Sequence, residues 1–165
     1  MRSAEATLTM NNPALTRAFG ERLGRLLKAG DVVALFGDLG AGKTTLTQGI
    51  AAGLEIDDEV DSPTYLLVQE HRGRLTLFHA DLYRIKDSSS LTEMGFEEYF
   101  EREGVTVIEW AERATDILPE ERLEIHLRYT PEAEDTREIT LKGWGTRFSQ
   151  LLESVKAEAH RAEAQ

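Results

Sequence analysis

The feature that most constrains the fold is a short glycine-rich segment, Gly37–Thr44, which reads GDLGAGKT and fits the pattern G-x-x-x-x-G-K-S/T. In such a segment the backbone amides cradle phosphate oxygens, while Lys43 reaches the outer phosphates and Thr44 binds magnesium. This chemistry requires a strand before the loop and a helix after it. Val32–Phe36 is an apolar run typical of a strand buried on both faces, and Thr44–Ala52 has helical character. The segment therefore predicts a phosphate-binding loop, or P-loop, within an α/β fold.

The rest of the chain also alternates strand-like and helical segments. Apolar runs predict further strands over Leu66–Glu70, Leu75–Ala80, Val105–Ile108, Leu123–Tyr129 and Glu138–Leu141. Helical spacing and end signals predict helices over Asn12–Ala29, Ser90–Glu103, Ala111–Leu118 and from Thr146 onwards. Helices between apolar strands indicate a three-layer P-loop NTPase fold with a mixed, mainly parallel central sheet.

The length of the chain indicates a single domain. Its 165 residues fall within the roughly 100–200 residues that one domain commonly has. We expect a P-loop domain over residues 1–152 and a C-terminal tail over residues 153–165. The tail is rich in alanine and glutamate, so it should be helical or frayed.

Composition narrows the possible functions. Lysine and arginine number 19 against 30 aspartates and glutamates, and the resulting net charge of −11 has the wrong sign for gripping nucleic acid through its phosphates. The absence of cysteine excludes disulfides, cysteine-bound zinc, iron–sulfur clusters and thiol nucleophiles. No apolar run approaches the roughly 18 residues of a membrane span, and the N-terminus lacks the apolar core of a secretory signal. We therefore expect a cytoplasmic protein that makes no contact with membranes.

The surroundings of the loop argue against a GTPase. Guanine-specific switch proteins use an Asn-Lys-x-Asp element, whereas the asparagines of this chain are Asn11 and Asn12, both before the loop. A D-x-x-G element after the loop is also missing.

Two carboxylates follow predicted strands and are candidates for the chemistry. Glu109 ends the apolar run Val105–Ile108, a position from which it could hold magnesium directly or through a water. Asp81 comes just after Leu75–Ala80 and could orient an attacking water. The alternatives are that Glu109 only caps the helix that follows and that Asp81 only forms a turn beside a core histidine.

The P-loop and three further motifs, in this order, resemble the TsaE family, also known as YjeE. The further motifs are a Ser-Pro-Thr-Tyr turn at Ser62–Tyr65, the segment His79–Arg84 (HADLYR), and Val107–Trp110 (VIEW). The resemblance covers roughly Asn12 to Tyr129. The P-loop alone is generic, whereas the other three motifs at this spacing are specific to the family.

The resemblance implies an ATPase that serves the synthesis of threonylcarbamoyladenosine at position 37 of tRNA. ATP binding is implied for Gly40, Ala41, Gly42, Lys43, Thr44 and Thr45. Magnesium binding is implied for Thr44 and Glu109, and catalysis for Asp81, Lys43 and Glu109. The implied partners are TsaB-like and TsaD-like proteins, with tRNA reached only through their complex.

We therefore expect a magnesium-dependent ATPase that is slow alone and resets the TsaB–TsaD complex. A small-molecule kinase with a P-loop is the first alternative, although no segment resembles the arginine-rich lid that such kinases close over the phosphates. The second alternative is a scaffold that binds ATP without hydrolysing it.

Overall fold

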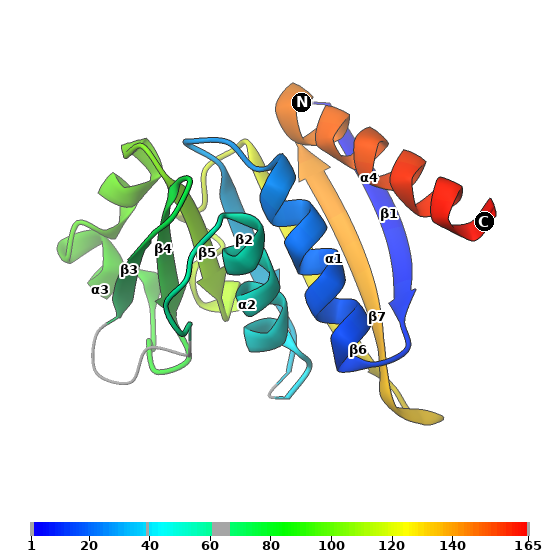
Figure 1. Cartoon of the computed structure of the whole chain (residues 1–165). Helices are drawn as coiled ribbons and strands as arrows, with labels where there is room; N and C mark the ends of the chain where they lie inside the picture. The colour runs from blue at the N-terminus through cyan, green and yellow to red at the C-terminus, as the bar shows by residue number, and fades with distance from the viewer. Residues whose placement is uncertain (1, 39, 61–66, 165) are drawn as a thin grey trace.

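A seven-stranded sheet with the order β1-β7-β6-β2-β5-β4-β3 forms the middle of the molecule (Figure 1). The computed structural model describes the backbone of residues 2–38, 40–60 and 67–164, and the side chains of these residues as far as 158. The strands are β1 (Ser3–Met10), β2 (Val32–Phe36), β3 (Val68–Arg72), β4 (Thr76–Asp81), β5 (Val105–Glu109), β6 (Arg122–Thr130) and β7 (Ala133–Trp144). The central strands β6, β2, β5 and β4 pair in parallel, whereas β1, β7 and β3 join through antiparallel pairs.

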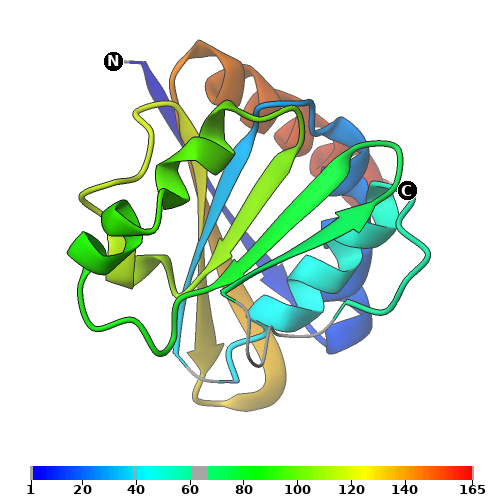
Figure 2. The same cartoon turned by 90° about the vertical axis from the view of Figure 1, so that its left-hand side faces the viewer.

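Helices cover both faces of this sheet and give the molecule three layers. One face carries α1 (Pro13–Leu26), α2 (Lys43–Gly53) and α4 (Thr146–Ala164). The other face carries α3 (Ser88–Glu93) and two short 3₁₀ helices, η1 (Phe96–Glu101) and η2 (Ala111–Ala114) (Figure 2). Among the residues described, none of these helices is long and apolar enough to span a membrane. The predicted fold class, with its parallel sheet centre, is confirmed.

Strand β2 shows how the sequence produces two cores. All five of its residues are buried, and successive side chains point to opposite faces. Val33 and Leu35 pack in the core beneath α1, α2 and α4. Val32, Ala34 and Phe36 pack in the smaller core beneath α3, η1 and η2. A continuous apolar run was therefore the correct signature for a strand covered on both faces.

Helices α1 and α2 touch through their backbones at glycine residues. A Cβ atom added at Gly24 of α1 would lie 2.3 Å from the Ile50 carbonyl oxygen, and one added at Gly49 of α2 would lie 2.2 Å from the Arg17 carbonyl oxygen. Gly20 and Gly53 also make close approaches in the same interface, where an added Cβ atom would lie 2.6 Å and 2.2 Å from the nearest backbone oxygen. This contact presses α2 against α1, and α2 begins at the P-loop lysine, so the packing helps to set the position of the loop.

The structure corrects several predicted elements. The single helix predicted over Ser90–Glu103 is wrong, because Gly95 adopts a left-handed conformation with φ 75° and separates α3 from η1. The helix predicted over Ala111–Leu118 is a short 3₁₀ segment, and α1 ends at Leu26 instead of Ala29.

The edge strands differ most from the prediction. Strand β1 was not predicted, and β7 extends well beyond Glu138–Leu141 to span Ala133–Trp144. These two strands pair with each other along the whole of β1, from Ser3 opposite Trp144 to Met10 opposite Arg137. The inward-facing positions of β1 include two alanines, so its alternating pattern is weak in the sequence.

Candidate functional site

The P-loop joins the carboxyl end of β2 to the first residue of α2. Gly40 and Gly42 have φ values of 79° and 103°, which lie in a backbone region that residues other than glycine rarely adopt. Gly42 is the N-cap of α2, and the Ala41 N–H donates to the Asp38 carbonyl oxygen at 3.0 Å within the loop. The loop thus ends at the N-terminus of a helix, where unpaired amides and the helix dipole favour an anion.

A cavity of about 400 Å³ opens beside this loop. Its lining residues are Gly40, Gly42, Lys43, Thr44, Thr45, Asp81, Tyr83, Glu109 and Trp110. All the candidate residues named from the sequence except Ala41 therefore line one cavity. Ala41 is buried behind the loop and borders a second hollow instead.

The two carboxylates reach the cavity from neighbouring strands. Asp81 is the last residue of β4 and Glu109 the last residue of β5, and the two are paired in the parallel register. Since the carboxyl ends of parallel strands meet at one edge of a sheet, this register brings two acidic side chains to the same place. The arrangement suits oxygen coordination of a divalent cation.

Glu109 is held by two partners at the floor of the cavity. Its Oε1 accepts a hydrogen bond of 3.0 Å from the Thr44 hydroxyl, and its Oε2 lies 2.5 Å from His79 Nε2. Both Glu109 and His79 are buried. Among the described residues His79 Nδ1 has no partner, and a proton there would be a buried unpaired donor. We therefore assign the proton to Nε2, from which His79 donates to the carboxylate.

Lys43 is held inside its own loop. Its ammonium donates to the carbonyl oxygens of Gly37 and Asp38, the latter at 3.0 Å, and lies 3.8 Å from the centre of the Trp110 ring. Burial lowers the pKa of Lys43, whereas the nearby carboxylates Glu112, Glu109, Asp81 and Asp38 raise it. A cation over an indole face is a favourable contact, so Trp110 helps to hold the lysine in place beside the cavity.

Asp81 has an environment suited to proton chemistry. Its Oδ1 accepts a hydrogen bond of 3.0 Å from the Tyr83 N–H, which orients the carboxylate. Burial raises the pKa of Asp81, and the negative charge of Glu109 raises it further. Groups whose pKa is shifted by burial and by a like charge in a cleft are candidates for catalysis.

Tyr83 and Trp110 border the cavity although neither was a predicted site residue. Their ring centroids lie 5.0 Å apart, so the two aromatic side chains form one wall. The signal that could have identified them is their position, because Trp110 follows Glu109 directly and Tyr83 comes two residues after Asp81. The Ser62–Tyr65 turn lies outside the described residues and stays a prediction.

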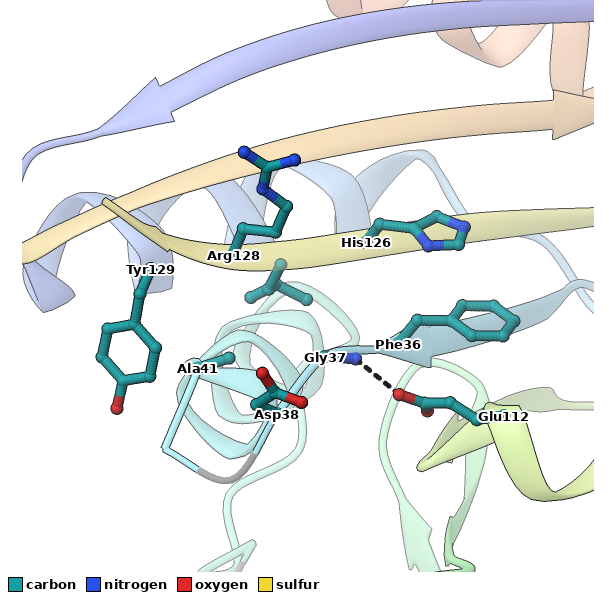
Figure 3. Close-up of a pocket in the computed structure, with 9 residues that line it drawn as sticks. Phe36, Gly37, Asp38, Ala41, Glu112, His126, Arg128 and Tyr129 are labelled. Carbon is teal, nitrogen blue, oxygen red and sulfur yellow. Dashed lines mark hydrogen bonds between the residues drawn. The ribbon is translucent and has the colours of Figure 1, made fainter. Parts of the chain in front are cut away.

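A second hollow, of about 510 Å³, is lined by residues from the end of β2, the P-loop, η2 and β6 (Figure 3). The Phe36 ring stacks on the His126 imidazole with 4.4 Å between centroids, and both side chains border the hollow. Glu112 of η2 accepts a hydrogen bond of 3.0 Å from the Gly37 N–H. The first residue of the P-loop is therefore tied to η2, a contact that sequence reasoning did not predict.

Comparison with known proteins identifies the family. The family model described as "Threonylcarbamoyl adenosine biosynthesis protein TsaE" matches residues 10–139, a range that includes every residue lining the cavity. The chain belongs to the TsaE family. A TsaE relative from Bacillus subtilis is 43% identical over 145 residues, which cover 87% of this chain and 89% of the relative.

Other TsaE relatives and a solved structure agree. The protein from Treponema pallidum is 44% identical over 126 residues, covering 76% of this chain and 92% of its own length. The crystal structure of Bacillus subtilis YdiB superimposes with a TM-score of 0.82 at 36% identity and covers 96% of this chain and 99% of that chain. The resemblance to TsaE proposed from the sequence motifs is confirmed.

Proposed function

We propose that the chain is a cytoplasmic, magnesium-dependent ATPase that acts in the biosynthesis of threonylcarbamoyladenosine in tRNA. The observation that carries this proposal is the single cavity in which the P-loop residues Lys43 and Thr44 meet Asp81 and Glu109. The names of the curated relatives, tRNA threonylcarbamoyladenosine biosynthesis proteins, support the pathway.

The loop provides the groups for binding ATP. Backbone amides of Gly40–Thr45 surround the start of α2, where the helix dipole favours phosphate oxygens. The Lys43 ammonium would exchange the carbonyl oxygens of Gly37 and Asp38 for the outer phosphates, because anionic oxygens are stronger acceptors. Ala41 would take part through its backbone amide alone, since its side chain is buried behind the loop, and this N–H would exchange the Asp38 carbonyl oxygen for a phosphate oxygen.

The donor set at the floor of the cavity fits magnesium. The Thr44 hydroxyl and the Glu109 carboxylate are hard oxygen ligands that already lie within 3.0 Å of each other. Bound magnesium would neutralise negative charge on the phosphates. His79 donates to the second oxygen of Glu109 and keeps the first oxygen turned toward Thr44.

Asp81 is the residue that we assign to the attacking water. Its half-buried carboxylate borders the cavity, and the Tyr83 N–H fixes its orientation. A carboxylate in this position can orient a water and accept its proton as the bond to the outer phosphate forms. Electrostatic stabilisation and positioning provide most of the rate in phosphoryl transfer, so no covalent intermediate is needed.

TsaB-like and TsaD-like proteins are the proposed partners, and tRNA is reached only through them. The net charge of −11 favours contact with proteins over direct contact with RNA. We propose that turnover is slow without these partners and resets their complex. If nucleotide binding favours the partner-bound state, ATP must raise the affinity of this chain for its partners. The partners must then raise the affinity of this chain for ATP by the same factor.

The test combines phosphate release with reciprocal titrations. Magnesium-dependent phosphate release without any added acceptor, faster when a TsaB–TsaD assembly is present, would support the ATPase and argue against a small-molecule kinase. A single turnover with the assembly that yields no phosphate would support a non-hydrolysing scaffold instead. ATP should be titrated with and without the assembly, and the assembly with and without a non-hydrolysable analogue. If the assembly did not change the affinity for ATP, and the analogue did not change the affinity for the assembly, nucleotide would not control partner binding.

A further inference from the structure

The β6–β7 hairpin contacts the tip of the P-loop from outside the cavity. The Tyr129 hydroxyl donates a hydrogen bond of 2.9 Å to the Gly40 carbonyl oxygen, and Arg137 Nη2 donates to the same oxygen at 3.3 Å. Tyr129 of β6 and Arg137 of β7 are register partners. One carbonyl of the nucleotide loop thus has two donors that belong to no recognised motif of the loop.

Further contacts within the hairpin hold the two donors in place. The Arg137 guanidinium lies 4.2 Å from the centre of the Tyr129 ring. Its Nη1 donates to the carbonyl oxygens of Glu134 at 2.7 Å and Thr136 at 3.1 Å. A side chain fixed by several contacts has already lost its rotamer freedom, so its bond to the loop costs little further entropy.

Gly40 is required for this contact. A Cβ atom at residue 40 would lie 2.5 Å from the Tyr129 hydroxyl, and the φ of 79° is strained for other residues. Figure 3 shows the Tyr129 side chain extending from β6 toward the loop. Gly40 therefore serves the approach of the hairpin as well as the curvature of the loop.

The contact sets the direction of the next amide. In a trans peptide the carbonyl and the following N–H point in opposite directions. Holding the Gly40 carbonyl toward the hairpin turns the Ala41 N–H away from it, and in this structure that N–H donates within the loop to the Asp38 carbonyl oxygen. We propose that Tyr129 and Arg137 are positioning residues that preorganise the P-loop for phosphate. This inference rests on the nucleotide binding proposed above.

The test separates action on the loop from contact with the nucleoside. Tyr129→Phe and Arg137→Gln are each expected to weaken binding of ATP and of inorganic tripolyphosphate by the same factor, about three- to tenfold for one lost hydrogen bond. Calorimetry measures both affinities. The turnover number at saturating ATP should stay near that of the wild type while KM rises, because the loop is reordered once ATP is bound. Arg137→Lys keeps a donor and should recover part of the affinity.

A readout without nucleotide completes the experiment. Hydrogen exchange of the loop amides, residues 37–43, should be faster in both variants than in the wild type. Glu132→Gln is the control, because Glu132 is an exposed residue in the turn of the same hairpin, and both the exchange and the affinities should be unchanged.

Three outcomes would overturn the proposal or its basis. Unchanged affinity and exchange in both variants would overturn the positioning role alone. Lost affinity for ATP with full affinity for tripolyphosphate would show that the pair contacts the nucleoside instead of ordering the loop. Failure of the wild type to bind either ligand would overturn the proposed function and, with it, the role of this pair in phosphate binding.

Discussion

The Thr44 hydroxyl donates a hydrogen bond of 3.0 Å to the carboxylate of Glu109, although 65 positions separate the two residues in the sequence. The parallel pairing of β2 with β5 explains the contact, since it sets Leu35 beside Glu109 and the loop with Thr44 follows directly after β2. A hydroxyl and a carboxylate meet here because two strands end at the same edge of the sheet.

Replacing the loop lysine should abolish most nucleotide affinity. Lys43→Ala removes the one P-loop side chain that carries a positive charge, and its bonds are made to carbonyls of its own loop, so the fold should persist. We expect the dissociation constant for ATP to rise about a hundredfold or more, as for loss of charge-assisted bonds. Calorimetric titration measures it, with the exposed Lys156→Ala as control. Unchanged affinity in folded Lys43→Ala would refute the P-loop assignment.

The dependence of turnover on magnesium concentration should change when Glu109 is replaced. Glu109→Gln is nearly isosteric and removes the negative charge beside Thr44. The magnesium concentration needed for half-maximal turnover should rise about tenfold or more, because a neutral amide is a weaker ligand for a hard cation. The measurement is a magnesium titration at saturating ATP, with the exposed Glu93→Gln as control. Superimposed titration curves would exclude Glu109 as a metal ligand.

Substitution of Asp81 should impair ATP hydrolysis without weakening ATP binding. Asp81→Asn keeps the shape of the side chain but cannot accept a proton, so ATP affinity should stay close to that of the wild type while turnover falls about a hundredfold or more. Single-turnover phosphate release and nucleotide titration measure the two quantities, and the exposed Asp135→Asn is the control. A parallel loss of affinity and turnover would make Asp81 a binding residue.

The packing of α1 against α2 should make a favourable helix substitution harmful. Alanine in a helix interior is about 1 kcal/mol better than glycine, but overpacking costs about 1–3 kcal/mol or more. At Gly49 the new Cβ would lie 2.2 Å from a backbone oxygen of α1. Gly49→Ala should therefore lower the free energy of unfolding by about 1–2 kcal/mol. Denaturant unfolding checks this, and the exposed Ser154→Ala on α4 should change it little. A more stable Gly49→Ala variant would show that the helices can move apart.

Stability should depend on pH through Glu124 of β6. Hydrogen bonds from His126 and Arg122 hold the pKa of Glu124 below its ordinary value. A depressed pKa in the folded state stabilises the fold above the ordinary glutamate value of about 4.3, and this stabilisation is lost as the pH falls through the folded-state pKa. Glu124→Gln should lower the free energy of unfolding at pH 7 by about 1–2 kcal/mol.

The pH series supplies the decisive comparison for Glu124. The difference between the wild type and Glu124→Gln should shrink as the pH is lowered below about 4.3. Denaturant unfolding at several pH values measures it, with the exposed Glu153→Gln as control. A constant difference at all pH values would mean that the charge of Glu124 does not stabilise the fold.

The elements nearest the P-loop were predictable because their signals are local. The strand predicted over Val32–Phe36 has the same bounds in the structure, and α2 starts one residue before the predicted helix. A buried strand, a glycine turn and an amphipathic helix are each encoded by residues a few positions apart. The same applies to the ends of β4 and β5, where Asp81 and Glu109 were proposed as site residues because each follows an apolar run.

Elements that depend on distant partners were not predictable. The pairing of β1 with β7 joins two strands that lie far apart in the sequence, and the alternation in β1 is too weak to indicate a strand until β7 lies beside it. The break at Gly95 was hidden because an isolated glycine is tolerated in a helical pattern, and only packing decides whether the helix continues.

The sequence by itself therefore determined the P-loop, the family motifs and the parallel centre of the sheet. Only the tertiary structure decided that Asp81 and Glu109 are register partners, that His79 holds Glu109, and that Tyr129 and Arg137 reach the Gly40 carbonyl. The physical reason is the distance in sequence between the residues that interact. Local conformation depends on neighbours within a few residues, whereas a hydrogen bond between remote side chains depends on strand order and register, which burial of the whole core selects.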